Sequence, residues 1–337
     1  MQTNPGTMRA QEPTRLAVIH RSDFSEMLYR IPQLGARIVG IMADRIREST
    51  KNEQQRDRLM ALGRLSAGLA HEINNPASAA SRATEHLRDA LKALQLDDKL
   101  AEAHTGLAWA LCYDFDMVGS ISEFQRAIAL NPNYATAHQW YGRHPLTALG
   151  RLNEAISEGK RATELDPLSP VINTDLGQTL LMARRYDEAI AQVRKTLEID
   201  PTFYYAHYTL GMALQLKGDV ATAIAEYTKA QQLSDDLRIQ VLLATAKAQS
   251  GDKDAPKQML AELDELNRHR YVRSYWRALL YLSQEKSDEA IRSLEKGVAD
   301  HDGLEIVWIK VDPLLDPVRG DPRFEALVQK VVGSKQK

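Results

Sequence analysis

One short stretch of the sequence combines residue types that could carry out chemistry. His71 is followed directly by a carboxylate, Glu72, and one helical turn later by an amide, Asn75. Leucine and isoleucine residues around them recur every three or four positions, which predicts a helix whose apolar stripe lies opposite His71. The imidazole is therefore expected to face solvent beside a carboxylate, a group type that can serve as a general base. A lone histidine more often has a structural role, so these residues by themselves leave both interpretations open.

The longer phrase that contains these residues resembles a known motif. It reads Leu62-Gly-Arg-Leu-Ser-Ala-Gly-Leu-Ala-His-Glu-Ile-Asn-Asn-Pro76, which is similar to the phosphoacceptor box of sensor histidine kinases. The resemblance implies that His71 accepts a phosphoryl group, that Glu72 orients and deprotonates the imidazole, and that Asn75 helps to position the phosphoryl group. It also implies a two-helix dimerisation hairpin over residues 53–94, which would pair two chains into a four-helix bundle.

The sequence after this hairpin does not continue as a kinase. It contains no Asp-x-Gly-x-Gly sequence and no glycine-rich loop that would cradle the phosphates of ATP. We therefore expect no autonomous kinase, but at most a phosphorelay component that works with a separate kinase or a response regulator. The N-terminal piece could equally be a relic of gene fusion, and the sequence does not separate these alternatives.

Residues 14–52 carry a further resemblance, to the tail of a cyclic-nucleotide-binding domain. An apolar run at 16–19 is expected to be a strand, and two helical segments follow it, the first broken at Pro32. The barrel and phosphate-binding cassette that would precede this tail are not in the sequence, so we expect no cyclic-nucleotide binding. Residues 1–13 are polar and are predicted to be a disordered tail.

From about residue 96 the sequence repeats itself. Glu-Leu-Asp-Pro ends at Pro167 and Glu-Ile-Asp-Pro ends at Pro201, so the spacing is 201 − 167 = 34 residues. Three alanines recur at the same interval: Ala155, Ala189 and Ala223. Each period is predicted to hold two amphipathic helices, because proline stops the second helix and a small residue lets the two helices approach.

These periods resemble the tetratricopeptide repeat. Leu210-Gly211, Ala223, Tyr227 and Ala230 follow the order of small and aromatic residues of that repeat. The resemblance implies an all-α fold, a right-handed superhelix of about six helix-turn-helix units over residues 95–303, with a C-terminal cap and tail at 304–337. Pro145 lies inside one expected first helix and is predicted to kink or shorten it.

In proteins of this family the first helices line a concave groove that binds a peptide or helix of a protein partner. The positions that the resemblance assigns to the groove are Trp140, Thr174, Gln178, Met182, Tyr205, Tyr208 and Met212. Aromatic and methionine side chains suit such a partner, because they offer large and adaptable contact area. The alternative is that some of them pack in the core between repeats.

The composition narrows the function classes further. The 337 residues carry a formal net charge of −2, which argues against a surface that coats nucleic acid, and Cys112 is the single cysteine, which excludes a disulfide framework. No apolar run is long enough for a membrane span and no apolar signal segment opens the chain, so we expect a cytoplasmic protein. We expect no cofactor and no metal site. The predicted function is a protein-interaction scaffold of bacterial signalling type, with the phosphorelay component as the alternative.

Overall fold

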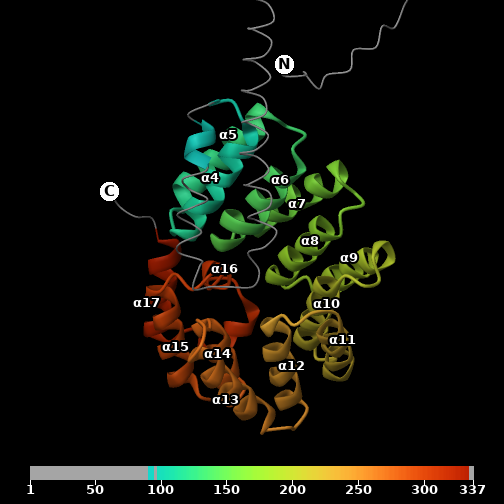
Figure 1. The fold of residues 1–337 in the computed structure, drawn as a ribbon, viewed down its shortest axis with the longest axis vertical. Helices are drawn as coiled ribbons and strands as arrows, with labels where there is room; N and C mark the ends of the chain where they lie inside the picture. Colours follow the sequence, from blue (N-terminus) through green and yellow to red (C-terminus); the bar gives the residue numbers. More distant parts are fainter. Residues whose placement is uncertain (1–89, 95–96, 334–337) are drawn as a thin grey trace, which may run out of the picture. The chain divides into compact units, whose positions relative to one another are not determined.

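The computed structural model describes residues 90–94 and 97–333, and these residues contain helices and turns but no strand. Six successive helix pairs make up most of this part of the chain (Figure 1). They are α4 (Ala101–Tyr113) with α5 (Met117–Leu130), α6 (Ala135–Tyr141) and its continuation η3 (Gly142–Leu146) with α7 (Leu152–Leu165), α8 (Pro170–Met182) with α9 (Tyr186–Ile199), α10 (Tyr204–Lys217) with α11 (Val220–Leu233), α12 (Leu237–Gln249) with α13 (Ala255–Asn267), and α14 (Ser274–Leu282) with α15 (Ser287–Ala299). A C-terminal segment follows with α16 (Leu304–Val307), the 3-10 helix η4 (Pro313–Val318) and α17 (Pro322–Val332). The all-α prediction is confirmed.

Several predictions fall outside the described residues. They are the disordered tail, the cyclic-nucleotide-binding-domain tail and the part of the hairpin that carries His71, Glu72 and Asn75. Of the hairpin, only 90–94 are described, and these five residues are helical.

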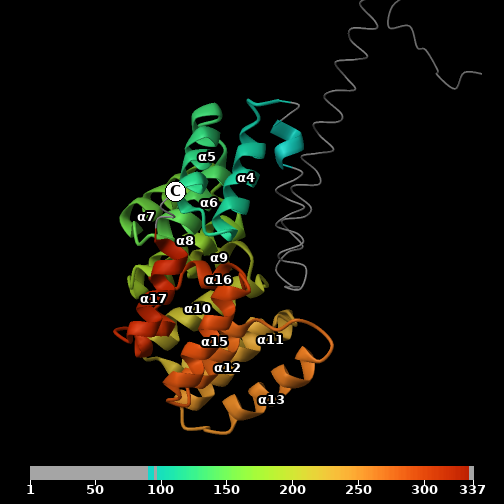
Figure 2. The same ribbon diagram turned by 90° about the vertical axis from the view of Figure 1, so that its left-hand side faces the viewer.

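The two helices of a pair differ in how much of their surface is buried. In α8, ten of the 13 residues are buried, whereas α9 buries four of its 14. Those four, Ala189, Ile190, Val193 and Thr196, lie on one face of the helix. The first helices (α4, α6, α8, α10, α12 and α14) therefore form the inner layer of the stack, and the second helices cover it from one side. Figure 2 shows the pairs from α4 to α13 following one another in sequence order.

Close approach within a pair explains the Leu-Gly dipeptides of the sequence. A Cβ atom added at Gly211 would lie 2.8 Å from the ring of Tyr227, and one added at Gly177 would lie 2.5 Å from Val193. Both distances are too short for non-bonded carbon atoms, so only glycine lets the second helix place a large side chain against the first. Asp-Pro sequences end two of the second helices as predicted: α7 stops at Leu165, before Asp166 and Pro167, and α9 stops at Ile199, before Asp200 and Pro201.

Pro145 changes the inner helix of the second pair without ending it. Residues 142–146 form a π-helical turn, in which the backbone N–H of Thr147 donates to the carbonyl of Gly142, five residues earlier. A π-helical turn accommodates one extra residue in a helix. This explains why Pro132 and Pro167 are 35 residues apart, not 34. The predicted shortening is correct for the α-helix, which ends at Tyr141, but the helical path continues.

A hydrogen-bonded side-chain pair recurs near the start of the inner helices. In α4, α6 and α10 a histidine Nδ1 lies 2.6 Å from a glutamate of the following outer helix, and its Nε2 lies within 3.0 Å of a carbonyl oxygen six residues earlier. The pairs are His104 with Glu123, His138 with Glu158, and His207 with Glu226. In α8 the neutral pair Asn173 and Gln192 takes the same place, with an N–O distance of 2.7 Å. These residues tie each inner helix to its outer helix and to the preceding turn.

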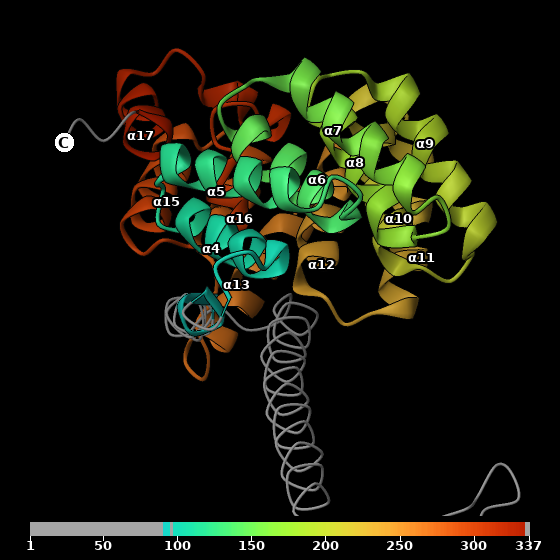
Figure 3. The ribbon, with the colours of Figure 1, turned by 90° about the horizontal axis from the view of Figure 1, so that it is seen from above.

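The C-terminal segment contacts both ends of the array. α17 packs on α15, and η4 packs on α14 and α15, so the segment covers the last pair. The same segment reaches the earlier pairs: α16 contacts α4, as Figures 1 and 3 show, and the indole N–H of Trp308 donates to the carbonyl of Arg143 at 3.0 Å. Lys310 Nζ donates to the carbonyl of Leu149 at 2.9 Å. The sequence predicted a cap on the last repeat but not these contacts with the first ones.

Candidate functional site

A cavity of about 660 Å³ lies among the inner helices. All six inner helices and the C-terminal segment contribute side chains to its wall, so the cavity is surrounded by elements from residue 109 to residue 314. Six of the predicted groove residues line it: Trp140, Gln178, Met182, Tyr205, Tyr208 and Met212. Thr174 does not, and its assignment was wrong. Its side chain is fully buried, and its hydroxyl donates to the carbonyl of Pro170 at 2.8 Å.

Aromatic rings form much of the cavity wall. The rings of Tyr205 and Tyr208, one turn apart on α10, are stacked with their centroids 6.0 Å apart. The ring centroids of Trp109 on α4 and Trp140 on α6 are 6.3 Å apart. Tyr205 and Trp140 are each partly exposed, whereas Tyr208 is almost fully buried. The wall therefore offers flat apolar surface to a ligand, held by rings that pack on one another.

Arg143 is buried in the wall of the cavity, with 3% of its surface exposed. Its guanidinium carbon lies 3.6 Å from the centre of the Trp308 ring, so the C-terminal segment supplies a cation–π partner. The same group donates to the side-chain carbonyl of Gln178, and its Nε lies 3.8 Å from Oδ1 of Asp175. The π-helical turn around Pro145 therefore carries the arginine that joins α8 to the C-terminal segment.

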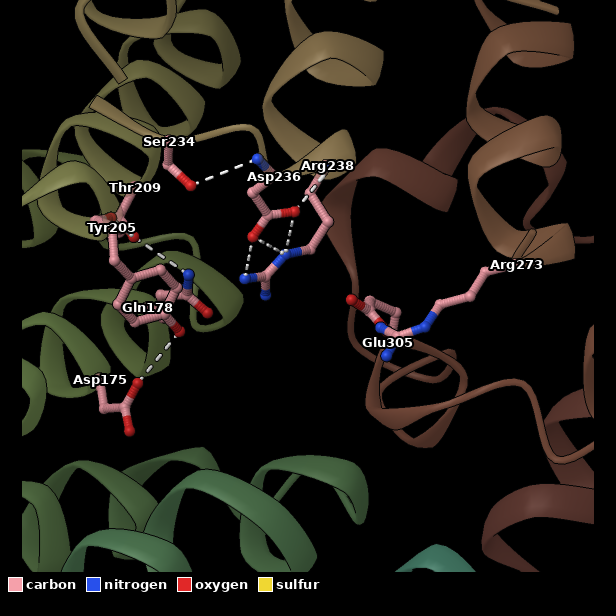
Figure 4. Close-up of polar contacts among 9 residues, drawn as sticks. All are labelled: Asp175, Gln178, Tyr205, Thr209, Ser234, Asp236, Arg238, Arg273 and Glu305. Carbon is pink, nitrogen blue, oxygen red and sulfur yellow. Dashed lines mark hydrogen bonds and ion pairs between the residues drawn. The ribbon is translucent and has the colours of Figure 1, made fainter. Parts of the chain in front are cut away.

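Asp175 collects further hydrogen bonds from two other inner helices. Its carboxylate accepts from Gln139 Nε2 at 2.7 Å and from the Tyr205 hydroxyl at 3.1 Å, the latter contact drawn in Figure 4. Burial raises the pKa of this carboxyl group above its usual value, and the nearby Arg143 charge and the two hydrogen bonds partly offset that effect.

A second arginine, Arg238, enters the cavity from the start of α12. Its Nε lies 2.9 Å from Oδ2 of Asp236, the residue that caps α12, and its Nη2 binds the same oxygen. The guanidinium carbon lies 5.8 Å from the Tyr205 ring and 5.6 Å from the Tyr208 ring. Figure 4 shows this ion pair facing Arg273 and Glu305.

A third arginine, Arg273, forms an ion pair with Glu305 across the junction between α14 and the C-terminal segment. Beside it, the hydroxyl of Tyr275 donates to the carboxyl group of Asp312. Burial raises the pKa of Asp312. Glu305 and Asp312 both belong to the segment after residue 303, which therefore supplies part of the cavity wall as well as a cap.

Comparison with known proteins assigns the repeats. Family models described as tetratricopeptide repeat match residues 146–213 and 204–236. Residues 146–236 are tetratricopeptide repeats. The matched range spans α7 to α11 and the turns around them, which include the aromatic residues of α10.

One solved structure has a similar fold over more of the chain than the matched range. A chain of the structure "Crystal structure of APC/C hetero-tetramer Cut9-Hcn1" aligns with 82% of this protein and over 48% of its own length. The identity is 14% and the TM-score is 0.52. "Functional Characterization of Pseudomonas Aeruginosa pilF" aligns with 68% of this protein and 98% of its own length, at 19% identity and a TM-score of 0.48. At 14% identity the likeness to the first of these structures concerns the fold alone. No curated protein sequence matches significantly.

The charged residues of the cavity were missed by the sequence analysis, although the tetratricopeptide period could have indicated two of them. Arg238 and Arg273 lie near the start of their inner helices, as Tyr204 does, and their spacings, 238 − 204 = 34 and 273 − 238 = 35, are close to the repeat period. The fifth pair lacks the usual small and aromatic residues, so the register was lost there. Glu305 and Asp312 follow the last pair, where no period applies.

Two further findings concern other kinds of site. Within the part of the chain that the structure describes, no group of three or more histidine, cysteine, aspartate or glutamate side chains could hold a metal ion. No helix there is long and apolar enough to cross a membrane. Cys112 is fully buried, and burial raises the pKa of its thiol to about 12, so it is held as a neutral structural thiol.

Proposed function

We propose that residues 95–303, together with the C-terminal segment, act as a protein-interaction scaffold of bacterial signalling type that binds a partner in the cavity of the inner helices. The observation that carries this proposal is the aromatic and methionine wall formed by Trp140, Met182, Tyr205 and Met212. A cavity of this size falls in the range that encloses a small ligand or a short segment of a larger one. Stacked rings and thioethers give such a segment contact area at low entropic cost.

Site-specific photo-crosslinking tests this proposal. Tyr204 lines the cavity and is partly exposed, and Val118 is 69% exposed on α5 and lies outside the cavity. A photoreactive residue at 204 is expected to crosslink a partner protein in the native cell extract, and one at 118 is not. The proposal fails if 204 yields no crosslinked protein, or if both positions yield the same one.

The sequence around His71 supports a second candidate function, a phosphorelay component without its own ATP-binding domain. In this proposal His71 accepts the phosphoryl group, Glu72 deprotonates the imidazole and Asn75 positions the phosphoryl group, while residues 53–94 pair two chains. The support is the resemblance to the phosphoacceptor box, which covers 62–76. A response regulator or a separate kinase would be the partner.

Two measurements test this second candidate. Incubation of the full chain with a small phosphodonor is expected to give acid-labile phosphate that His71→Gln abolishes. Light scattering is expected to find a dimer for the full chain and a monomer for a chain that begins at Leu96. Absence of phosphate at His71 would remove the phosphorelay role, and a monomeric full chain would remove the pairing through 53–94.

A further inference from the structure

The charges that line the cavity balance one another. Three arginines contribute to its wall, Arg143, Arg238 and Arg273, and so do three acidic residues, Asp175, Glu305 and Asp312. A partner that enters the cavity therefore meets no excess of either sign among the residues that line it.

Each of these charges is also engaged within the protein. Arg143 faces Asp175 and lies on the Trp308 ring, and Arg273 is paired with Glu305. Arg238 is paired with Asp236, which lies behind the wall, and Asp312 accepts a hydrogen bond from Tyr275. Separating the members of a buried pair leaves each charge uncompensated in a medium of low dielectric constant, which is strongly unfavourable. These pairs are therefore expected to persist when a ligand binds.

A charged ligand group gains little from such a wall. A carboxylate that approached Arg273 would also approach Glu305, and an ammonium group that approached Asp175 would also approach Arg143. In each case attraction is largely cancelled by repulsion, while the ligand charge still loses its hydration. Aromatic and aliphatic groups carry no such cost, and Trp140, Tyr204 and Tyr205 offer them partly exposed ring surface.

We propose that the cavity binds an uncharged segment of a protein partner that carries aromatic or aliphatic side chains, and not an acidic or basic tail. This inference rests on the proposed scaffold function and specifies its ligand. The paired polar groups hydrogen-bond the backbone of that segment, since a guanidinium has five N–H donors and a carboxylate has about four lone-pair sites. The partner is selected by shape and apolar contact, so its affinity depends little on salt.

Val171 provides a position for testing the sign of the ligand charge without disturbing the fold. It is the second residue of α8, lines the cavity and is 46% exposed. Leu168, three residues earlier and 73% exposed, is not part of the cavity wall and serves as the matched control. Peptides selected from a random phage-displayed library on the full chain are the probes, and fluorescence anisotropy measures their dissociation constants.

Val171→Asp and Val171→Arg are both expected to weaken binding by about threefold or more, because either charge is placed against an uncharged ligand. The same changes at Leu168 should leave affinity unchanged. Raising the salt concentration from 0.05 to 0.5 M should change the dissociation constant by less than about twofold.

Opposite effects of aspartate and arginine at 171, or selected peptides with a strong net charge, would overturn the inference while leaving the scaffold function intact. If no selected peptide responds to changes at Val171 or to Trp140→Ala, the scaffold function at this cavity is refuted and the inference with it.

Discussion

Asp302 is a carboxyl group held almost entirely out of water, with 2% of its surface exposed, three residues after the end of α15. Its Oδ2 accepts a hydrogen bond from the backbone N–H of Tyr275 at 3.0 Å, so it ties the start of α14 to the segment that leads into α16. Burial raises the pKa of Asp302 to about 7, although this hydrogen bond favours the ionised form. At neutral pH the ionised form of this buried carboxyl group therefore destabilises the folded state, although its hydrogen bond joins two elements.

The variant Asp302→Asn is expected to remove a pH dependence from the stability of the protein. A raised carboxyl pKa means that the folded state binds the proton more tightly, so the stabilisation is complete below the unfolded pKa of 3.8 and is lost as the pH rises through about 7. The free energy of unfolding of the wild type should fall by up to about 4 kcal/mol more than that of the variant between pH 4 and pH 8. Urea denaturation at several pH values measures this difference.

Asp300→Asn is the control for this prediction, because Asp300 lies two residues earlier on the exposed surface. It should leave the pH profile of the wild type unchanged. Parallel profiles of the wild type and Asp302→Asn would contradict the burial argument.

At the scale of helices, local pattern predicted much of what the structure contains. The repeated Asp-Pro sequences placed the ends of the outer helices α7 and α9, because proline restricts the backbone of its immediate neighbours. The resemblance to the tetratricopeptide repeat then assigned Tyr205 and Gln178 to one surface, and the period carries the position of Gln178 to Met212, since 212 − 178 = 34. Thr174 failed because the stripe of α8 that faces the cavity runs through Val171, Asp175, Gln178 and Met182, and Thr174 lies beside that stripe and is fully buried.

The extra residue of the second unit could be counted in the sequence but not located. Pro145 predicted an irregularity, because proline has no backbone N–H to donate. A kink, a helix end and a π-helical turn are all compatible with that missing donor. The structure selects the π-helical turn, in which Thr147 also donates its hydroxyl to the carbonyl of Gly142 at 2.8 Å. The register of the pair His138 and Glu158 confirms this location: the two residues are 20 apart, and the partners in the other three pairs are 19 apart.

The pair His138 and Glu158 predicts a pH effect at the level of the second helix pair. The hydrogen bond that the His138 imidazole donates to Glu158 raises the pKa of His138 above 6.5. The resulting stabilisation is complete below the unfolded pKa of 6.5 and is lost as the pH rises through the higher folded pKa. The double variant His138→Asn with Glu158→Gln, which copies the neutral pair of α8 and α9, should lack this loss, which we expect to be on the order of 1 kcal/mol.

Urea denaturation between pH 6 and pH 9 measures the effect, and the reverse exchange provides the control. Asn173→His with Gln192→Glu places a charged pair where the neutral pair stands, so it should add a loss of stability over the same pH range. An unchanged pH profile in both double variants would show that these pairs do not couple folding to protonation.

At the scale of the whole array, the contacts of the C-terminal segment are the feature that sequence reasoning could not reach. Trp308 and Arg143 are 165 residues apart, and their contact depends on the rotation accumulated over several helix pairs rather than on any local pattern. Arrays of repeats usually have only neighbour-to-neighbour contacts, so their ends unfold independently. Here a further ion pair joins Arg184, at the turn after α8, to Asp316 of η4 at 2.6 Å, so the middle of the array is also held.

Trp308→Ala is therefore expected to loosen the first helix pairs as well as the last. Trp308 is 7% exposed, lies under the guanidinium of Arg143 and stacks on His144 with ring centroids 5.8 Å apart, so its removal should cost about 3–5 kcal/mol. Hydrogen exchange measured by mass spectrometry should show faster exchange in α4 and α6, which lie 167 to 207 residues before the substitution in sequence. The matched control is Phe324→Ala, which removes a fully buried ring of α17 that packs at the far end of the array. That variant should speed exchange in α14 and α15 first, and equal exchange patterns in the two variants would show that Trp308 does not couple the two ends.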